Sequence, residues 1–175
     1  MPGALMAMVA AAALQPHIRP FDIASGSSLL TGYAEAARAL DLACYPPTGL
    51  WSAATFAAEF CNERTTAIGA WQPAAGDVDS EELVGMAFTT TVFEEAALTS
   101  IAVHPTSRRR GVAEALMREC MSRAAAAGAT RFTLEVRAGN EAANAMYAKF
   151  GMTCVGRRKR YYANGEDALI FDADM

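Results

Sequence analysis

The chain has 175 residues, of which 53% are hydrophobic, so it can bury enough apolar surface to offset the entropy of ordering and is not expected to be disordered. This length suits a single hydrophobic core. The formal net charge of -4 argues against general nucleic-acid binding, which needs a basic surface that displaces counterions from phosphates, and favours cationic partners instead.

The first residues of the chain are rich in alanine and methionine. The run over residues 1–14 has no basic residue before it and is too short to span a bilayer. We therefore expect a flexible N-terminal extension over residues 1–15, a single domain over residues 16–175, and no membrane partner. A degenerate targeting sequence remains an alternative for the extension.

The first predicted elements are a strand and two helices. Weak alternation predicts a strand over residues 17–23, followed by a turn over residues 25–28. A second, short helix is expected after Ser52, which can cap it, with Phe56 and Phe60 on one face. The first helix is expected between that turn and Ser52, because apolar residues recur there at helical spacing until two prolines end the pattern. These positions are Leu29, Leu30, Tyr33, Ala37, Leu40 and Cys44, then Pro46 and Pro47.

The middle of the chain changes to strand periodicity. Apolar or β-branched runs over residues 65–71 and 83–91 predict a hairpin, joined by a polar connection that we expect to be a solvated loop. A third strand over residues 96–103 would complete an antiparallel meander. The polar connection contains Pro73, Gly76, Asp77, Asp79, Glu81 and Glu82.

Helices and strands alternate in the second half. Apolar residues at intervals of three and four predict a long helix from Gly111, which Gly128 is expected to end in a left-handed conformation. A helix that crosses between two strands makes them parallel, so the fourth and fifth strands should be parallel. We predict a mixed α+β fold with a sheet of about seven strands, otherwise antiparallel, and about four helices. The later elements are expected at residues 131–136 (strand), 140–150 (helix, closed by Gly151), 153–162 (strand) and 167–171 (strand).

The four cysteines do not have the spacing of a metal site. Cys44, Cys61, Cys120 and Cys154 are scattered, form no CxxC pair, and are accompanied by only two histidines. We therefore expect neither zinc nor another metal. Because each cysteine has apolar or small neighbours, we expect buried, reduced thiols of a cytosolic protein rather than disulfides.

The most informative segment covers residues 101–115, where a strand passes through a basic turn into a helix. Unpaired N–H groups of the first helical turn, the helix dipole and the missing side chain at Gly111 make such a turn an anion site that suits a pyrophosphate. A P-loop or a dinucleotide fold would require glycine patterns that this sequence lacks. From this turn alone, an ordinary helix start with surface arginines remains an equal alternative.

Three segments resemble one enzyme family. R-R-R-G-V-A, residues 108–113, resembles the R/Q-x-x-G-x-G/A signature of GNAT acetyltransferases. L-E-V-R-A-G-N-E-A-A-N-A-M-Y-A-K-F-G-M, residues 134–152, and G-R-R-K-R-Y-Y-A-N-G-E-D-A-L-I, residues 156–170, are similar to stretches of the bacterial ribosomal-protein-alanine N-acetyltransferase subfamily. The departures are Ala113, where a second glycine is commoner, and Gly139, where serine is usual.

The resemblance implies a GNAT fold, whose parallel strands splay apart, and acetyl-CoA as the cosubstrate. Backbone groups of Ile101 and Val103 on the splayed edge would pair with the pantetheine arm like an added strand, and an N–H there would stabilise the oxyanion. The implied acetyl-CoA site comprises Ile101, Ala102 and Val103 along the strand, Arg109, Arg110, Gly111, Val112, Ala113 and Glu114 around the pyrophosphate, and Asn140 beside the pantetheine.

Two residues are candidates for the proton transfers of a direct attack in a ternary complex. An α-amino group with a pKa of about 7.7 to 8.0 is mostly protonated at pH 7, so a general base helps, and Glu135 is the candidate. The departing CoA thiolate needs a general acid, for which the phenol of Tyr147 is the candidate. Taken alone, Glu135 would more readily face solvent and Tyr147 would more readily be a core aromatic. Their motif context favours catalysis.

For the acceptor, the resemblance implies the N-terminal alanine of a small-subunit ribosomal protein, without direct nucleic-acid binding. Trp51, Tyr161 and Tyr162 are expected to wall the acceptor cleft, and Trp51 with Ser52 resembles the subfamily's P-W-S element. A lysine side chain or a small-molecule amine is an alternative acceptor. A non-catalytic acyl-CoA-binding module is an alternative of another class. We expect a cytoplasmic protein, or one of the plastid stroma if the extension is a targeting remnant.

Overall fold

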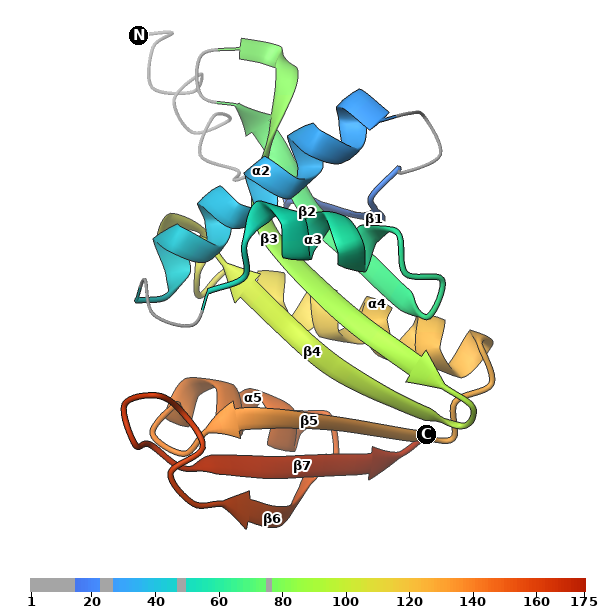
Figure 1. Cartoon of the computed structure of the whole chain (residues 1–175), viewed down its shortest axis with the longest axis vertical. Helices are drawn as coiled ribbons and strands as arrows, with labels where there is room; N and C mark the ends of the chain where they lie inside the picture. Colours follow the sequence, from blue (N-terminus) through green and yellow to red (C-terminus); the bar gives the residue numbers. More distant parts are fainter. Residues whose placement is uncertain (1–14, 23–26, 47–49, 75–76) are drawn as a thin grey trace, which may run out of the picture.

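The computed structural model describes residues 15–22, 27–46, 50–74 and 77–175 (Figure 1). Apart from Gln15, the expected N-terminal extension lies outside these ranges. None of the helices within the described ranges combines the length and the apolar character that crossing a bilayer requires.

Seven strands form one mixed sheet in the order β1-β2-β3-β4-β5-β7-β6. Neighbouring strands are antiparallel except β4 and β5, which are parallel. The predicted meander, the parallel pair and the mixed α+β class are therefore confirmed. The strands are β1 (His17–Pro20), β2 (Thr65–Ala74), β3 (Asp77–Val92), β4 (Glu95–Val103), β5 (Arg131–Arg137), β6 (Thr153–Arg158) and β7 (Ala168–Asp174).

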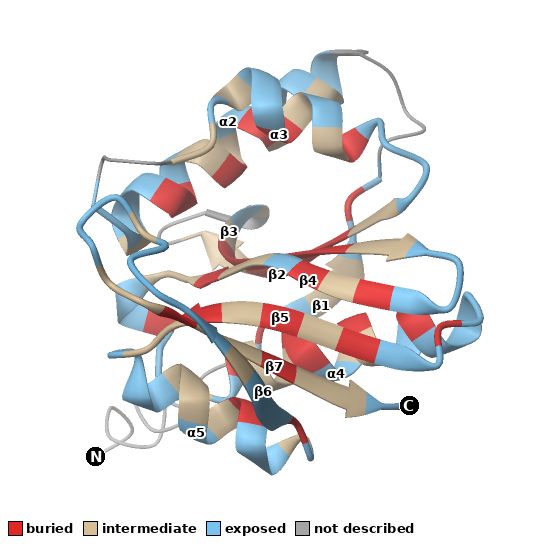
Figure 2. Ribbon diagram, turned by 60° about the horizontal axis from the view of Figure 1, so that its bottom comes forward, coloured by how far each residue is buried: buried red, intermediate tan, exposed pale blue. Residues whose placement is uncertain are grey.

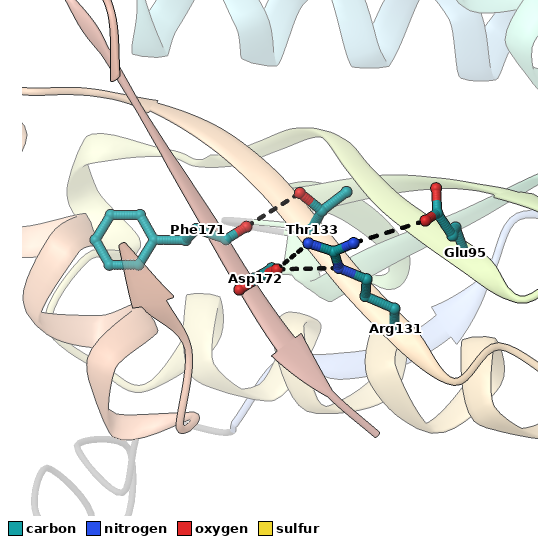
Figure 3. A network of polar contacts seen from close by, with 5 residues as sticks. All are labelled: Glu95, Arg131, Thr133, Phe171 and Asp172. Atoms are coloured by element: carbon teal, nitrogen blue, oxygen red, sulfur yellow. Dashed lines mark hydrogen bonds and ion pairs between the residues drawn. The ribbon is translucent and has the colours of Figure 1, made fainter. Parts of the chain in front are cut away.

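The parallel strands β4 and β5 pair at only one end. Their ladder runs from Glu95 with Arg131 to Leu98 with Leu134, and beyond it the two strands diverge (Figure 1). At the paired end, the guanidinium of Arg131 lies between the carboxylates of Glu95 on β4, at 3.8 Å, and Asp172 on β7, to which its Nε donates at 3.0 Å (Figure 3). This bridge links three strands at the paired end of the ladder, and the sheet opens at the opposite end.

Helices cover both faces of the sheet (Figure 2). α2 (Ser27–Cys44) and α3 (Ala53–Phe60) lie on one face, and α4 (Val112–Ala126) and α5 (Glu141–Lys149) lie on the other. A short 3-10 turn, η2 (Pro105–Ser107), precedes α4. Each face buries its own apolar core, because each helix presents an apolar side to the sheet. The first core includes Phe21, Phe56, Phe60, Trp71 and Phe88, and the second includes Leu116, Met117, Phe132, Leu134 and Tyr147.

The predicted helix ends are confirmed except at the start of α2. Ser52 caps α3, and its Oγ accepts a backbone N–H of the first turn at 3.0 Å. Gly128 follows α4 with a φ of 91°, and Gly151 follows α5 with a φ of 75°. The turn expected at residues 25–28 is wrong where it is described, because α2 already begins at Ser27. Serine is well suited to the N-terminal end of a helix as well as to a turn.

The solvated loop expected inside the first hairpin is instead mostly strand. β2 and β3 continue until residues 75–76, which lie outside the described ranges. Across the ladder, Gln72 Nε2 donates to Glu82 at 2.6 Å, and Arg19 on β1 forms an ion pair with Glu81 at 2.6 Å. These cross-strand polar contacts let an acidic segment extend the hairpin.

The strand expected at residues 153–162 ends early, at Arg158. The carboxylate of Asp167 accepts the backbone N–H of Arg160 at 2.7 Å and pairs with Arg157 Nε at 2.6 Å. Arg160 also has a left-handed φ of 52°. This turn ends the ladder, so the two tyrosines that follow lie in the loop between β6 and β7.

The four cysteines are free thiols, as expected, but they differ in burial. Cys120 is buried in the core and Cys44 is half-buried, whereas Cys61 and Cys154 are exposed. The expectation of buried thiols is therefore wrong for the last two. Cys61 directly follows the end of α3, and Cys154 lies on the edge strand β6, so their apolar sequence neighbours do not pack over them.

Candidate functional site

The diverging ends of β4 and β5 border a cavity of about 1680 Å³. The end of α2, the start of α4, α5 and the loop between β6 and β7 supply its other walls. Most of the predicted site residues line this cavity although they come from distant segments. They are Ile101, Val103, Arg109, Gly111, Val112, Ala113, Glu114, Glu135, Asn140 and Tyr147.

Two of the predicted site residues are placed differently. Ala102 is 3% exposed and packs into the core beneath α2 and α3, because successive side chains of a strand point to opposite faces of the sheet. Arg110 is half-buried and is not among the described residues that line the cavity. The resemblance assigned a continuous run of residues, whereas the fold turns only part of that run toward the cavity.

Backbone carbonyls on the open edge of β4 supply hydrogen-bond acceptors to one wall of the cavity. The carbonyl of Ile101 accepts a hydrogen bond from the Tyr45 hydroxyl at 2.6 Å. That of Val103 accepts from the Cys44 thiol at 3.3 Å and from Arg108 Nε at 3.0 Å. Burial raises the pKa of Tyr45 to about 12 and raises the pKa of the Cys44 thiol, so both groups keep their protons at neutral pH. These side-chain donors contact the part of β4 that β5 leaves unpaired, because the ladder between the two strands ends at Leu98.

The start of α4 is the positive end of the cavity. Gly111 has a φ of 77°, and a Cβ added there would meet nothing within 4 Å in the described part of the chain. N–H groups of the first helical turn have no intrahelical partner, and the helix dipole adds partial positive charge. Arg109 lies in the same wall, with the buried Ser107, whose hydroxyl has no hydrogen-bond partner among the described residues. Glu114 of the first turn is paired with Lys149 at 3.0 Å, so this end can bind an anion.

Glu135 projects from β5 into the cavity wall. Its side chain is 29% exposed, and its Oε1 lies 3.0 Å from Arg158 Nε on β6. The hydroxyl of Tyr161 lies near the same carboxylate, and their interaction raises the pKa of Tyr161. A carboxylate offers about four lone-pair positions, so the ion pair with Arg158 leaves room for hydrogen bonds to Glu135. In the described ranges, no cluster of histidine, cysteine, aspartate or glutamate side chains is arranged to hold a metal ion.

Tyr147 on α5 is at once a core residue and part of the cavity wall. It is 3% exposed, and its ring centroid lies 6.1 Å from that of Phe171. Burial raises the pKa of its phenol, and the nearby phenols of Tyr45 and Tyr162 raise it further. Tyr147 therefore stays protonated throughout the neutral range and can donate a proton. The two roles considered for it, packing and proton donation, are compatible in this position.

Asn140 lies where α5 begins and lines the cavity. Its Oδ1 accepts the backbone N–H of Ala143 at 3.2 Å and so caps the helix. The side chain of Asn144 fixes the same junction by donating to the carbonyl of Ala138 at 3.1 Å. Asn140 therefore sets the direction of the helix that carries Tyr147.

Aromatic side chains line the end of the cavity near α2 and the loop between β6 and β7. Trp51, Tyr161 and Tyr162 all contribute to this wall, and their role at the acceptor cleft stays a prediction. The ring of Trp51 lies 5.2 Å from that of Phe56 and 5.7 Å from that of Phe88, which anchors it to the core beneath. Of these three residues, Tyr161 and Tyr162 lie near the carboxylate of Glu135.

Sequence reasoning assigned no role to Arg137 and Glu166, which hold this wall in place. The guanidinium of Arg137 lies 3.9 Å from the ring centroid of Tyr162 and 3.0 Å from Glu166. Glu166 Oε1 also accepts the backbone N–H of Gly139 at 3.0 Å, which with Arg137 lowers its pKa. Arg137 lies in L-E-V-R and Glu166 lies in E-D-A, within two of the three segments that carry the family resemblance. That resemblance was the signal by which the sequence could have indicated them.

Comparisons with known proteins identify relatives of this chain. The model of the acetyltransferase (GNAT) family matches residues 34–152. A Bacillus subtilis protein, itself provisionally assigned as a ribosomal protein bS18-alanine N-acetyltransferase, is 42% identical over 89 residues, which cover 50% of this chain and 59% of that protein. The match thus spans less than two thirds of that relative.

Solved structures share the fold. The crystal structure of the ribosomal-protein-S18-alanine N-acetyltransferase from Escherichia coli is 28% identical, with a TM-score of 0.73 over 90% of this chain and 92% of that chain. Arabidopsis thaliana NAA60 in complex with acetyl-CoA is 19% identical, also with a TM-score of 0.73, over 91% of this chain and 98% of that chain. The second likeness shows the fold alone.

Proposed function

Because the chain belongs to the acetyltransferase (GNAT) family, we propose that it transfers an acetyl group from acetyl-CoA to the α-amino group at the N-terminus of a protein. One observation carries the proposal: the cavity between the diverging strands joins the helix start at Gly111 to the carboxylate of Glu135 and the phenol of Tyr147. An anion site, an open backbone edge, a base and an acid are the parts that acyl transfer from a CoA thioester to an amine uses.

The residues around the cavity fit acetyl-CoA. Its pyrophosphate would bind the N–H groups that follow Gly111, with Arg109 and the unpartnered Ser107 hydroxyl as further donors. Its pantetheine amides would pair with the open edge at Ile101 and Val103, in place of the side-chain donors that now contact these carbonyls. The acetyl-CoA held by the Arabidopsis structure of the same fold supports this choice of cosubstrate. The other residues expected at the site stay predictions: Ala102, Arg110, Val112, Ala113, Glu114 and Asn140.

Glu135 is the proposed general base. The acceptor amine attacks the thioester carbonyl directly, in a ternary complex, as its proton passes to the carboxylate or to one intervening water. Arg158 pairs with Oε1 of that carboxylate, which lines the cavity and keeps lone pairs for an acceptor amine or a water.

Tyr147 is the proposed general acid. When the new C–N bond has formed and the C–S bond breaks, the CoA thiolate leaves and takes the phenol proton. Burial keeps this phenol protonated, so the donor is in the correct state at neutral pH. Its packing against Phe171 holds the hydroxyl in a fixed position.

The acceptor is proposed to be the N-terminal alanine of a small-subunit ribosomal protein. The Bacillus subtilis and Escherichia coli relatives carry that activity in their names, which supports the proposal. The cleft beside Trp51, Tyr161 and Tyr162 offers rings that can cover a short side chain while the amine reaches Glu135.

Incubation with acetyl-CoA and short peptides tests the proposal. A peptide that begins with alanine should gain one acetyl group by intact mass, with release of one thiol per acetyl group. The same peptide with a blocked α-amine but a free lysine should not react. Acetylation of the lysine would make the acceptor a side-chain or small-molecule amine instead, and CoA binding without thiol release above the peptide-free control would identify a binding module.

A further inference from the structure

The carboxylate proposed as the base lies in an ion pair rather than alone. Arg158 Nε is 3.0 Å from Glu135 Oε1, and Arg158 comes from β6, which β7 separates from the strand of Glu135. The side chains are 58% and 29% exposed, respectively, so the pair lies at the cavity wall and not in the core. Both residues line the cavity, so Arg158 lies beside Glu135 on the wall that an acceptor would approach.

This placement bears on the protonation of the acceptor. An α-amino group has a pKa of about 7.7 to 8.0, and an unpaired carboxylate within about 4 to 6 Å would raise it by stabilising the ammonium ion. Only the neutral amine has the lone pair that attacks a thioester. A cation beside the carboxylate brings the local charge close to zero and removes most of that stabilisation.

Resting on the proposed function, we propose that Arg158 is a positioning residue that keeps the bound acceptor amine in its neutral, nucleophilic form by pairing with Glu135. The ion pair also restrains the carboxylate, because the Arg158 guanidinium lies 3.0 Å from its Oε1. Arg158 thus acts through Glu135 and not on the thioester.

The other groups around Glu135 do not supply this charge. On its own sheet, Glu135 stands opposite the apolar Ile170 of β7. Tyr161 and Tyr162 carry phenols whose pKa is raised, so they are neutral, and Arg137, two residues along the strand, is paired with Glu166. The remaining charged or titratable groups of the cavity come from other walls: Asp41, Cys44, Tyr45, Arg108, Arg109, Glu114, Tyr147 and Lys149.

Three variants test the role. Arg158→Gln removes the positive charge, and Arg158→Lys keeps it. Lys159→Gln is the control, because it removes the charge of the next residue, which is exposed and does not form the ion pair with Glu135. Each is compared with the unmodified chain by kcat and KM for an alanine peptide between pH 6 and 9.5, with melting temperature as a folding check. For Arg158→Gln we expect the kcat profile to shift about one pH unit upward. The KM for the peptide at pH 6.5 should fall about threefold, because the ammonium form now binds Glu135.

The split between kcat and KM separates this role from a structural one. Arg158→Lys should restore the original profile, and Lys159→Gln should leave it unchanged. A uniform loss of kcat/KM at every pH in Arg158→Gln, or a rise in KM at low pH, would overturn the inference even if peptides are acetylated. If the unmodified chain acetylated no peptide at any pH, the proposed function itself would fail, and this role for Arg158 with it.

Discussion

The hydroxyl of Tyr45 donates a 2.6 Å hydrogen bond to the carbonyl of Ile101 and so ties the end of α2 to the open edge of β4. Tyr45→Phe removes this contact and keeps the ring. We expect the free energy of unfolding at pH 7 to fall by about 1 kcal/mol, the usual net worth of one such bond. Urea denaturation measures it, and an unchanged midpoint would show that water replaces the hydroxyl without loss.

The same residue gives the stability a dependence on alkaline pH. Burial raises the pKa of Tyr45 in the folded state to about 12, from an ordinary value of 10. Because the pKa of Tyr45 is higher in the folded state, its protonated phenol makes its full contribution to the free energy of unfolding below pH 10. This contribution is lost as pH rises toward 12. The buried Tyr147 acts in the same direction. Denaturation at pH 9 and pH 11.5 should therefore show a smaller loss in Tyr45→Phe than in the unmodified chain, and equal losses would contradict the assignment.

Gly111 and Gly128 form a matched pair at the two ends of α4. Both have a positive φ, of 77° and 91°, and at both an added Cβ meets nothing within 4 Å in the described part of the chain. Alanine at either position should cost about 1 kcal/mol of stability, because side chains disfavour this conformation. Only Gly111 lines the cavity.

Acetyl-CoA affinity should therefore separate the two variants. Gly111→Ala places a methyl group where the pyrophosphate is proposed to bind, so we expect its Kd for acetyl-CoA to rise about tenfold, equivalent to one charge-assisted hydrogen bond. Gly128→Ala should keep the original Kd by isothermal titration. An equal effect of both substitutions would mean that stability, and not the anion site, controls binding.

Local sequence signals predicted the parts of the fold that depend on nearby residues. The cap at Ser52 acts within one helical turn, and the left-handed φ expected at Gly128 is one that glycine adopts without steric cost. The parallel pairing of β4 and β5 followed from the helix that crosses between them.

Contacts between distant segments were outside the reach of those signals. Tyr45 and Ile101 are 56 residues apart, and Arg137 and Glu166 are 29 apart, so only the assembled sheet brings them together. The site expected from the family motif included consecutive residues of one strand, Ala102 among them. Successive side chains of a strand point to opposite faces, so that of Ala102 points into the core instead.

Glu135→Gln tests the proposed base with little change of shape. We expect kcat to fall by about 10² to 10³, because a positioned base contributes on this scale, while the Kd for acetyl-CoA changes less than twofold. Glu119→Gln is the matched control, since that carboxylate is paired with Arg123 on α4, away from the cavity. A rate that is unchanged at every pH would refute a role for Glu135 as base.

Tyr147→Phe keeps the packing against Phe171 and removes only the hydroxyl. We expect kcat to fall by about 10² while acetyl-CoA binding is retained, because the thiolate then leaves without a proton donor. In the unmodified chain the raised pKa of this buried phenol should leave kcat without an alkaline fall between pH 8 and 9.5. A thiol-release assay across that range measures both. Full activity of Tyr147→Phe would assign the proton to another donor.

Arg137 should control the acceptor side of the cavity and not the acetyl-CoA side. Its guanidinium stacks on Tyr162 and pairs with Glu166, whose lowered pKa keeps the pair charged down to acidic pH. Arg137→Met keeps an apolar stem but frees the loop that carries Tyr162, so we expect the KM for an alanine peptide to rise about tenfold, the size of a lost cation–π contact together with its ion pair. The KM for acetyl-CoA should stay within twofold.

Arg123→Met provides the control for that measurement, because Arg123 is ion-paired on α4 with no part in the cavity wall. It should leave both KM values unchanged. Two alternatives make opposite predictions for Arg137→Met. If the loop is held mainly by the hydrogen bonds of Asp167, which the substitution leaves intact, the peptide KM will not move. If Arg137 instead supports α5 through Glu166 and Gly139, the KM for acetyl-CoA will rise together with that for the peptide. A selective rise in the peptide KM is the result that places Arg137 behind the acceptor wall.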